Sequence, residues 1–414
     1  MPDPQSTDNT GALDNGARDR ASSSSAARRV ATILRERILS GQYAPGEWLP
    51  AERDLTEELR VHRRIVRAAA VMLANEDLLV RRTNCRPVVN IPTGMQQLPQ
   101  HVDATDIDAL PDEEAVAFTP ASRTVALLMC RGGGVFELEG TAHQRIDRGI
   151  TARLADEGDN VERQTQFLDL EVIGSEAENA AREAFHISYA LRRGYAGIVF
   201  YPYATESNIA IVRAAAKRVP FVLIDRRLAG VEADYVGIQN RAAIYDATKR
   251  LIDLGHKRIA FLTLPQNVNT VYDRQQGYIQ AITEAFGGER QELILTTPDH
   301  DAKSWPVFNA VFQQPAGKRP TAAICVNDHI AVRATDHLDE LGLRVPTDVS
   351  IMGFDNIVTK LPNGVALSTI AQPYEGIGRT AADLILRRLE KPLLEHVDIE
   401  LPCTFVDRDS IRAI

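Results

Sequence analysis

Four apolar stretches of this 414-residue chain are each followed by a polar side chain that can form hydrogen bonds. The pairs of stretch and side chain are 221–224 with Asp225, 322–326 with Asn327, 350–353 with Asp355, and 367–370 with Gln372. In open α/β sheets, ligands bind beyond the carboxyl ends of the strands. Carboxylate and amide groups accept and donate hydrogen bonds as sugar hydroxyls require. The pattern therefore predicts a binding site for a sugar-like small molecule.

A second group of candidate residues lies near the amino end and is basic. Arg63 and Arg67 are four residues apart, so they share one face of a helix, while Val66 and Leu73 lie on the opposite face with Ala69 and Ala70. Arginine pairs in a bidentate manner with guanine or with phosphate. The spacing favours a DNA-reading helix, and the alternative is a solvated helix face without a partner.

The elements around these arginines form a small domain over residues 26–90. Helical spacing is expected over about 26–39, 51–59 and 63–75, and two short strands are expected over 78–82 and 86–89. Between Arg28 and Asn90 there are twelve arginines, no lysine and eight acidic residues, a net charge of +4. The whole chain has a net charge of −9, so the remainder carries −9 − 4 = −13. A basic end on an acidic body is typical of a modular DNA-binding protein.

Composition separates this domain from its neighbours. Residues 1–25 are rich in Ser, Asn, Asp and Gly and are expected to be disordered. Residues 91–121 are rich in Pro, Asp and Ala and are expected to form a linker.

Residues 122–414 alternate apolar runs with amphipathic stretches. Apolar strands separated by helices indicate parallel sheets that are covered on both faces. The number of strand–helix units predicts two lobes, the first over about 122–238 and 372–392, the second over about 239–371 and 393–414. The expected fold class is α/β: an N-terminal winged helix-turn-helix plus a two-lobed domain with parallel sheets.

The region 28–90 resembles the GntR family of winged-helix regulators. The resemblance rests on Leu39-Ser40-Gly41, Pro45-Gly46, Leu49-Pro50-Ala51-Glu52-Arg53-Asp54-Leu55, Arg63, Arg67 and Leu78-Leu79-Val80-Arg81-Arg82. It implies DNA contacts by the arginines at 53, 63 and 67. The chain departs from the family pattern at His62, where a small hydroxyl residue is usual, and at Asn84-Cys85-Arg86, where the wing usually carries glycine. The candidate DNA-binding residues are Arg53, His62, Arg63, Arg64, Arg67, Asn84 and Arg86.

Residues 122–414 resemble the LacI/GalR effector domain, which is periplasmic-binding-protein-like. The matching segments are 219–226, 254–260, 273–278, 320–328, 342–356 and 367–373. The resemblance implies ligand contacts by Arg274, Asn327, Asp355 and Gln372, and it places Trp305 near a pocket aromatic. With Asp225, these are the candidate ligand-binding residues. A GntR-type head on a LacI-type body resembles arabinose-responsive repressors.

Simpler structural roles are open for each ligand-site candidate. Asp225, Asn327 and Asp355 could cap following helices, Arg274 could be a surface arginine, and Trp305 could belong to the core. Asp328 is a weaker candidate that could also be a cap.

Sequence patterns of common enzymes are absent, including G-x-S-x-G, HExxH and Walker A. The segment 376–381 fits a loose G-x-G-x-x-A dinucleotide pattern, but no strand runs directly into it. Gly132-Gly133-Gly134 could cradle a phosphate, although a flexible loop is the simpler interpretation. The four cysteines at 85, 130, 325 and 403 show no metal-type spacing. We therefore expect no catalytic residues, no metal and no cofactor, and an enzyme with a fused DNA-binding head is the rival hypothesis.

The chain has no apolar run of 18 residues and no leader-like amino end, so a cytoplasmic protein without a membrane span is expected; a secreted binding protein is the less favoured alternative. The expected partners are double-stranded operator DNA and a sugar effector, and the protein is expected to be a homodimer because dimers read paired half-sites. Each unit is expected to have its own core, so the signal would pass through dimer geometry.

Overall fold

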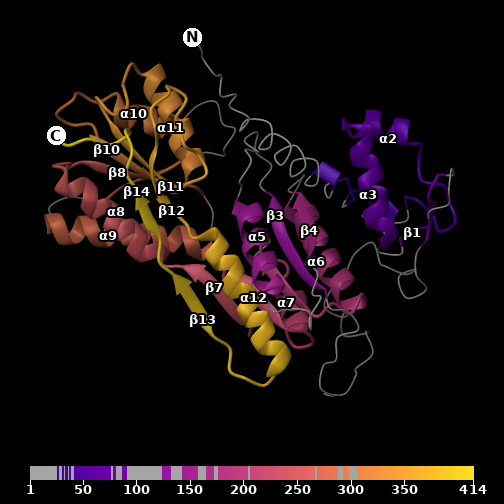
Figure 1. Ribbon diagram of the computed structural model, residues 1–414. Coiled ribbons are helices and arrows are strands. Elements are labelled where there is room, and N and C mark those ends of the chain that lie inside the picture. Colours follow the sequence, from indigo (N-terminus) through magenta and orange to yellow (C-terminus); the bar gives the residue numbers. More distant parts are fainter. Residues whose placement is uncertain are drawn as a thin grey trace, which may run out of the picture.

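The computed structural model describes a small head and two α/β lobes (Figure 1). The residues described are 26–27, 30–31, 33–35, 37–38, 42–75, 78–80, 86–90, 124–131, 142–156, 165–171, 176–203, 206–265, 268–287, 292–297 and 305–414. The expected tail 1–25, the expected linker 91–121 and the glycines 132–134 lie outside the described residues.

The head consists of helices and a two-stranded sheet, as its apolar periodicity predicts. Helical residues occur between 26 and 38, followed by α2 (Glu52–Glu58), α3 (Arg63–Asn75), β1 (Leu79–Val80) and β2 (Val88–Val89). The strands pair antiparallel, with Leu79 opposite Val89. Val66, Ala69, Ala70 and Leu73 are all buried, so the predicted inward face of α3 is confirmed. On the opposite face of α3, Arg63, Arg64 and Arg67 are exposed.

Lobe 1 is a parallel six-stranded sheet in the order β13-β7-β6-β5-β3-β4. Its strands are β3 (Val125–Arg131), β4 (Thr165–Glu171), β5 (Gly197–Tyr201), β6 (Phe221–Ile224), β7 (Asp234–Ile238) and β13 (Asp398–Leu401). Its helices are α5 (Ala142–Ala155), α6 (Glu176–Arg192), α7 (Ile209–Ala216) and α12 (Tyr374–Glu390). The apolar runs of β5 and β6 are buried almost throughout, as expected for strands covered on both faces.

Lobe 2 is a second six-stranded sheet, in the order β14-β12-β11-β10-β8-β9. Its strands are β8 (Ile259–Thr263), β9 (Leu293–Thr296), β10 (Ala322–Cys325), β11 (Ser350–Asp355), β12 (Ser368–Ala371) and β14 (Thr404–Val406). Its helices are α8 (Asn240–Asp253), α9 (Asn269–Phe286), α10 (Pro306–Phe312) and α11 (Asp328–Glu340). All pairs are parallel except β12 with β14. One parallel sheet and one predominantly parallel sheet, each covered by helices, therefore confirm the expected fold class.

One boundary between the lobes is corrected by the topology. The sequence placed the whole of 393–414 in lobe 2, but β13 pairs with β7 of lobe 1, with Ile399 opposite Val236. The chain then passes from β13 to β14 of lobe 2 (Figure 1). The prediction was wrong for 398–401 because strand pairing, not local pattern, decides which sheet takes this edge strand.

One glycine of the loose dinucleotide pattern, Gly378, has a packing role. Gly378 lies inside α12, where a Cβ atom would lie 2.1 Å from the carbonyl oxygen of Ile146 on α5. Gly149 on α5 makes the reciprocal approach, since a Cβ there would lie 2.2 Å from the carbonyl oxygen of Glu375. These glycines allow α5 and α12 to pack closely against each other.

The two faces of the lobe 1 sheet belong to different hydrophobic clusters. Leu127 and Met129 face a cluster that includes α12 and lobe 2, whereas Ala126 and Leu128 face a cluster that includes α6 and the head. In the head, Arg35 is only 1% exposed, and its guanidinium carbon lies 5.9 Å from the ring centre of Tyr189 on α6. The expectation of separate cores was therefore wrong, because the head shares buried residues with lobe 1.

Candidate functional site

Polar side chains from both lobes meet beyond the carboxyl ends of the strands. We call Asp225, Arg274, Asp355 and Gln372 the strand-end site. Asp225 follows β6 of lobe 1, and Asp355 ends β11 of lobe 2. The negative charge of Asp225 raises the pKa of Asp355, although less than burial does, so the two lobes present carboxylates to the same region.

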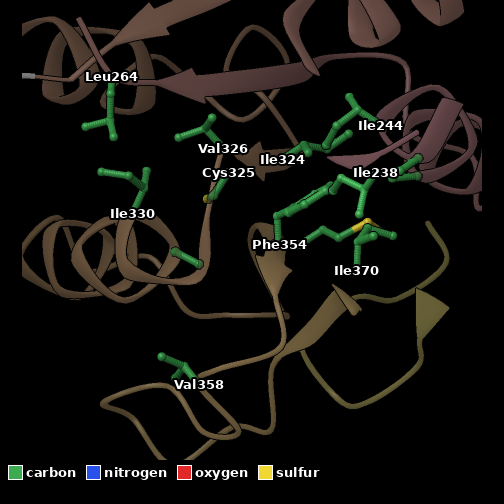
Figure 2. Packing of buried hydrophobic residues seen from close by; sticks show 14 of the residues in the cluster. Ile238, Ile244, Leu264, Ile324, Cys325, Val326, Ile330, Phe354, Val358 and Ile370 are labelled. Carbon is green, nitrogen blue, oxygen red and sulfur yellow. The ribbon is translucent and has the colours of Figure 1, made fainter. Parts of the chain in front are cut away.

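Arg274 is fixed in place by three partners. Its Nε donates to Asn240 Oδ1 at 2.7 Å and its Nη1 donates to the carbonyl oxygen of Val326 at 2.7 Å. Its guanidinium carbon lies 3.8 Å from the ring centre of Phe354. The side chain is 8% exposed, so the alternative of an ordinary surface arginine is wrong. Phe354 belongs to the buried hydrophobic cluster, so the arginine packs against the core (Figure 2).

Asp355 connects the arginine to Gln372. Gln372 Nε2 donates to Asp355 Oδ1 at 2.6 Å, and Arg274 Nη1 lies 3.9 Å from the same oxygen. Desolvation raises the pKa of Asp355 to about 7, and the charge of Arg274 opposes that shift. Gln372 Oε1 is buried and has no hydrogen-bond partner within the described part of the chain. This arrangement can accept and donate hydrogen bonds at once, as a hydroxyl-rich ligand requires.

The helix-cap alternative fails for both aspartates of the site. Asp225 has φ of 65° and is followed by β7, and Asp355 has φ of 108° and is followed by an irregular turn. Non-glycine residues in this region are uncommon and cluster at functional sites. These two backbones are therefore held by tertiary contacts rather than by helix capping.

Asn327 and Trp305 have the simpler structural roles that the sequence left open, a helix cap and a core residue. Asn327 caps α11, since its Oδ1 accepts a hydrogen bond from the Ile330 amide at 2.9 Å. Trp305 is 1% exposed, with its ring centre 4.8 Å from that of His337 and 5.6 Å from that of Phe308. The structure thus brings Asp225, Arg274, Asp355 and Gln372 together, whereas Trp305 packs in the core of lobe 2.

Sequence reasoning missed three side chains of this region. Asn240, at the start of α8, orients Arg274. Tyr201, at the end of β5, lies near Asp225, and Tyr374 is buried near Asp225, Asp355 and Arg274. Burial is the first cause that raises the pKa of both tyrosines. Tyr201 follows the same strand-end rule as the predicted residues and could have been found by it.

Two cavities lie away from the strand-end site. One of about 320 Å³ is lined by Lys257, Arg258 and Lys318, among others, and one of about 550 Å³ by Arg213, Lys217 and Leu393, among others. Both are next to residues where strands begin, such as Ile259 and Phe221. Ligands of open α/β sheets bind at the other ends of the strands, so the strand-end residues are the candidates for a small-molecule site.

The candidate DNA-binding residues lie on the surface of the head. Arg53, His62, Arg63, Arg64, Arg67 and Arg86 are all exposed, and Asn84 lies outside the described residues. Glu52 orients two of them, since its carboxylate accepts from Arg63 Nε at 2.5 Å and from Arg67 Nε at 2.9 Å. The hydrogen bond from Arg67 is the largest cause that lowers the pKa of Glu52. Arg63 and Arg67 are therefore held together on the open face of α3.

Neither a metal cluster nor a membrane helix is found in the described ranges. No group of three or more His, Cys, Asp or Glu residues there could hold a metal ion. No helix among the same residues is long and apolar enough to cross a membrane.

Known proteins match both parts of the chain. Residues 26–87 match the model of bacterial regulatory proteins of the gntR family, and residues 248–411 match a periplasmic binding protein-like domain. The arabinose metabolism transcriptional repressor of Geobacillus stearothermophilus is 24% identical over 384 residues, which cover 91% of this chain and 95% of that protein. The ribose operon repressor of Haemophilus influenzae is 33% identical over 197 residues, 47% of this chain and 58% of that protein.

Solved structures show the same fold. A complex of the transcriptional regulator CelR with cellobiose has a TM-score of 0.57 at 21% identity and covers 87% of this chain and all of that chain. A LacI family regulator from Enterococcus faecium with bound ribose has a TM-score of 0.52 at 24% identity and covers 70% of this chain and 99% of that chain. The chain therefore joins a gntR-type helix-turn-helix head to a two-lobed, periplasmic-binding-protein-like domain with the LacI fold.

Proposed function

We propose that this protein is a ligand-responsive transcriptional repressor of carbohydrate catabolism genes, that it binds operator DNA as a homodimer, and that a sugar releases it. The observation that carries the proposal is the presence in one chain of an exposed arginine face on α3 and a buried hydrogen-bonding site at the strand ends. One unit has the chemistry to bind DNA and the other the chemistry to bind a polyhydroxyl ligand. The names of the relatives, repressors of arabinose metabolism and of the ribose operon, support the same conclusion.

The arrangement of the head supports DNA as the partner. In a helix-turn-helix the second helix enters the major groove, and its amino-terminal residues contact base edges. Arg63, Arg64 and Arg67 occupy this part of α3 and are all exposed. Since Glu52 holds two of them together, it reduces the freedom that they lose on binding.

The chemistry of the strand-end site supports a sugar as the effector. Asp225, Asp355 and Gln372 offer acceptors and donors from separate strands, and Arg274 adds a fixed cation. Since Arg274 is already engaged by Asn240, Val326 and Asp355, a neutral hydroxyl-rich ligand matches the site better than a strongly anionic one. A thermal-shift screen with free pentoses, hexoses and cellobiose tests this assignment, because a ligand that binds the folded state raises the melting temperature.

An enzyme that acts on a sugar or sugar phosphate is the second candidate function. The strand-end site has two carboxylates, and the raised pKa of Asp355 is a feature that also occurs in catalytic acids. The named repressor relatives favour binding without turnover. Conversion of any sugar or sugar phosphate by the purified chain, lost in Asp355→Asn, would favour the enzyme.

The first prediction concerns DNA recognition. Arg63→Ala and Arg67→Ala are each expected to weaken operator binding by about 1–3 kcal/mol if the side chain contacts a base. Binding of the unmodified protein is expected to weaken steeply as salt increases, because phosphate contacts release counterions. Gel-shift titration at two salt concentrations measures both effects.

The matched control for these variants is Arg148→Ala. Arg148 is also an exposed arginine that pairs with a glutamate, but it lies on α5 of lobe 1. Operator affinities of the Arg63 and Arg67 variants equal to that of the Arg148 variant would remove both residues from the DNA interface.

The second prediction concerns coupling between the two sites. The effector is expected to lower operator affinity, and by thermodynamic linkage saturating operator lowers effector affinity by the same factor, typically about 5–150-fold. Calorimetric titration of the effector with and without operator DNA measures this factor. Identical effector affinity in both titrations would rule out an allosteric regulator even if each site binds.

A further inference from the structure

Asp328 is a buried carboxylate whose partners all lie on other parts of lobe 2. It is 0% exposed and is the first residue of α11. Its Oδ2 accepts hydrogen bonds from the amides of Ile357 at 2.8 Å and Val358 at 3.0 Å. Its Oδ1 accepts from the Thr369 hydroxyl at 2.7 Å. The carboxylate therefore ties the start of α11 to the turn after β11 and to β12.

The turn that Asp328 holds contains two residues with unfavourable backbone angles. Asp355 has φ of 108° and Asn356 has φ of 56°. Both residues lie just before Ile357 and Val358, whose amides donate hydrogen bonds to the Asp328 carboxylate. Such conformations persist only where the surroundings over-determine them. Asn356 is restrained from a second side, because its Oδ1 accepts from Arg408 Nη2 at 2.7 Å.

The neighbouring strand is shaped to admit this carboxylate. Gly353 lies two residues before Asp355, and a Cβ atom at position 353 would lie 2.2 Å from Asp328 Oδ1. A side chain at 353 would therefore require the Asp328 carboxylate or the backbone of β11 to shift. Since Val358 is also buried, water does not replace these hydrogen bonds easily.

We propose that Asp328 is a positioning residue of the effector site: by accepting the Ile357 and Val358 amides, it holds the strained turn that presents the Asp355 carboxylate to Arg274 and Gln372. The proposal rests on the proposed function, since it takes the strand-end site to be the effector site. It assigns Asp328 a role through Asp355 rather than a ligand contact of its own. Asp328 has no direct bond to Arg274 or Gln372 among the bonds of the described residues.

The test is a double-mutant cycle on effector affinity with arabinose and ribose as probes. Asp328→Asn keeps the size of the side chain but places an amide where an acceptor is needed, and it is expected to weaken binding of the responding sugar at least tenfold. In an Asp355→Asn background the same change is expected to add less than twofold, because the group that Asp328 positions is already altered. Operator affinity without sugar is expected to be unchanged.

A merely structural role gives a different result in this cycle. General loosening of lobe 2 would weaken sugar binding by the same factor in both backgrounds, and that outcome would overturn the proposal. Wild-type affinity in Asp328→Asn would also overturn it. The matched control is Asp336→Asn, a partly buried aspartate further along α11, which is expected to leave sugar affinity unchanged.

Two further measurements keep the test decisive. If Asp328→Asn does not fold, the same cycle is measured with Thr369→Val, which removes only the donor to Asp328 Oδ1. This variant is expected to show a smaller loss of sugar affinity, and that loss is again expected to disappear in the Asp355→Asn background.

If the wild-type protein binds neither sugar, the sugar assignment fails for those sugars, and the positioning role is tested by amide hydrogen exchange. Exchange at Ile357 and Val358 is expected to be faster in Asp328→Asn than in Asp336→Asn, and equal exchange would overturn the proposal.

Discussion

Arg274→Ala is expected to abolish the response to effector while operator binding without effector stays intact. Truncation of one partner in a buried, hydrogen-bonded charge network typically costs about 2–5 kcal/mol of binding free energy. Here it would leave Asn240 Oδ1 and the Val326 carbonyl without their donor and would leave Asp355 without its cation. Calorimetry with the responding sugar and gel shift with operator DNA measure the two quantities separately.

The control for Arg274→Ala is Arg344→Ala. Arg344 is 74% exposed and pairs with Asp348 on the surface of lobe 2, so its loss is expected to change effector affinity by less than twofold. Asp355→Ala is expected to match Arg274→Ala, because the two groups belong to one network. Unchanged effector affinity in both Arg274→Ala and Asp355→Ala would refute the assignment of the site.

Arg388→Ala is expected to produce the largest loss of stability in lobe 1. Asp234 is completely buried at the start of β7, and Arg388 on α12 donates to it from Nε at 2.7 Å and from Nη2 at 2.9 Å. Removal of one partner of a buried pair typically costs about 3–5 kcal/mol. Asp234 would keep only the Val397 amide at 2.9 Å and the more distant Arg387 and His396, each at 3.8 Å. Urea unfolding of the full chain measures the loss as a lower unfolding midpoint.

A surface ion pair on the same helix provides the comparison. Arg379 is 51% exposed and pairs with Asp156 at 3.2 Å, and exposed pairs of this kind contribute about 0–1 kcal/mol. Arg379→Ala is therefore expected to shift the midpoint only slightly. Equal shifts for Arg379→Ala and Arg388→Ala would mean that the buried network does not hold α12 and β7 together.

Local pattern predicted the elements well where burial alone decides them. The run 221–224 is buried at every position because helices cover both faces of its sheet, and a continuous apolar run is what such a strand requires. The inward face of α3 follows from helical spacing in the same way. Local pattern does not predict which sheet a short edge strand joins. The side chains of β13 alternate between exposed and partly buried, and only its pairing with β7 places it in lobe 1.

The strand-end rule located Asp225, Asp355 and Gln372, because it needs only the end of each strand and the residue that follows. It could not separate a ligand contact from a helix cap, since both use the same residue types. Asn327 caps α11, whereas no helix follows Asp225. Asn240 was missed because its role is to accept a hydrogen bond from Arg274. The two residues are 34 positions apart in the sequence and meet only in the folded chain.

The buried surface that the head shares with lobe 1 limits how freely such proteins can exchange parts during evolution. A domain joined only by a chain of polar residues can be replaced by another of different shape without further change. Here the first helix of the head places Arg35 over Tyr189 of α6, and apolar residues of both units belong to one cluster. A foreign head would uncover this side of α6, so a successful exchange requires compensating substitutions at positions such as Tyr189. The head and lobe 1 are therefore expected to have diverged as a matched pair.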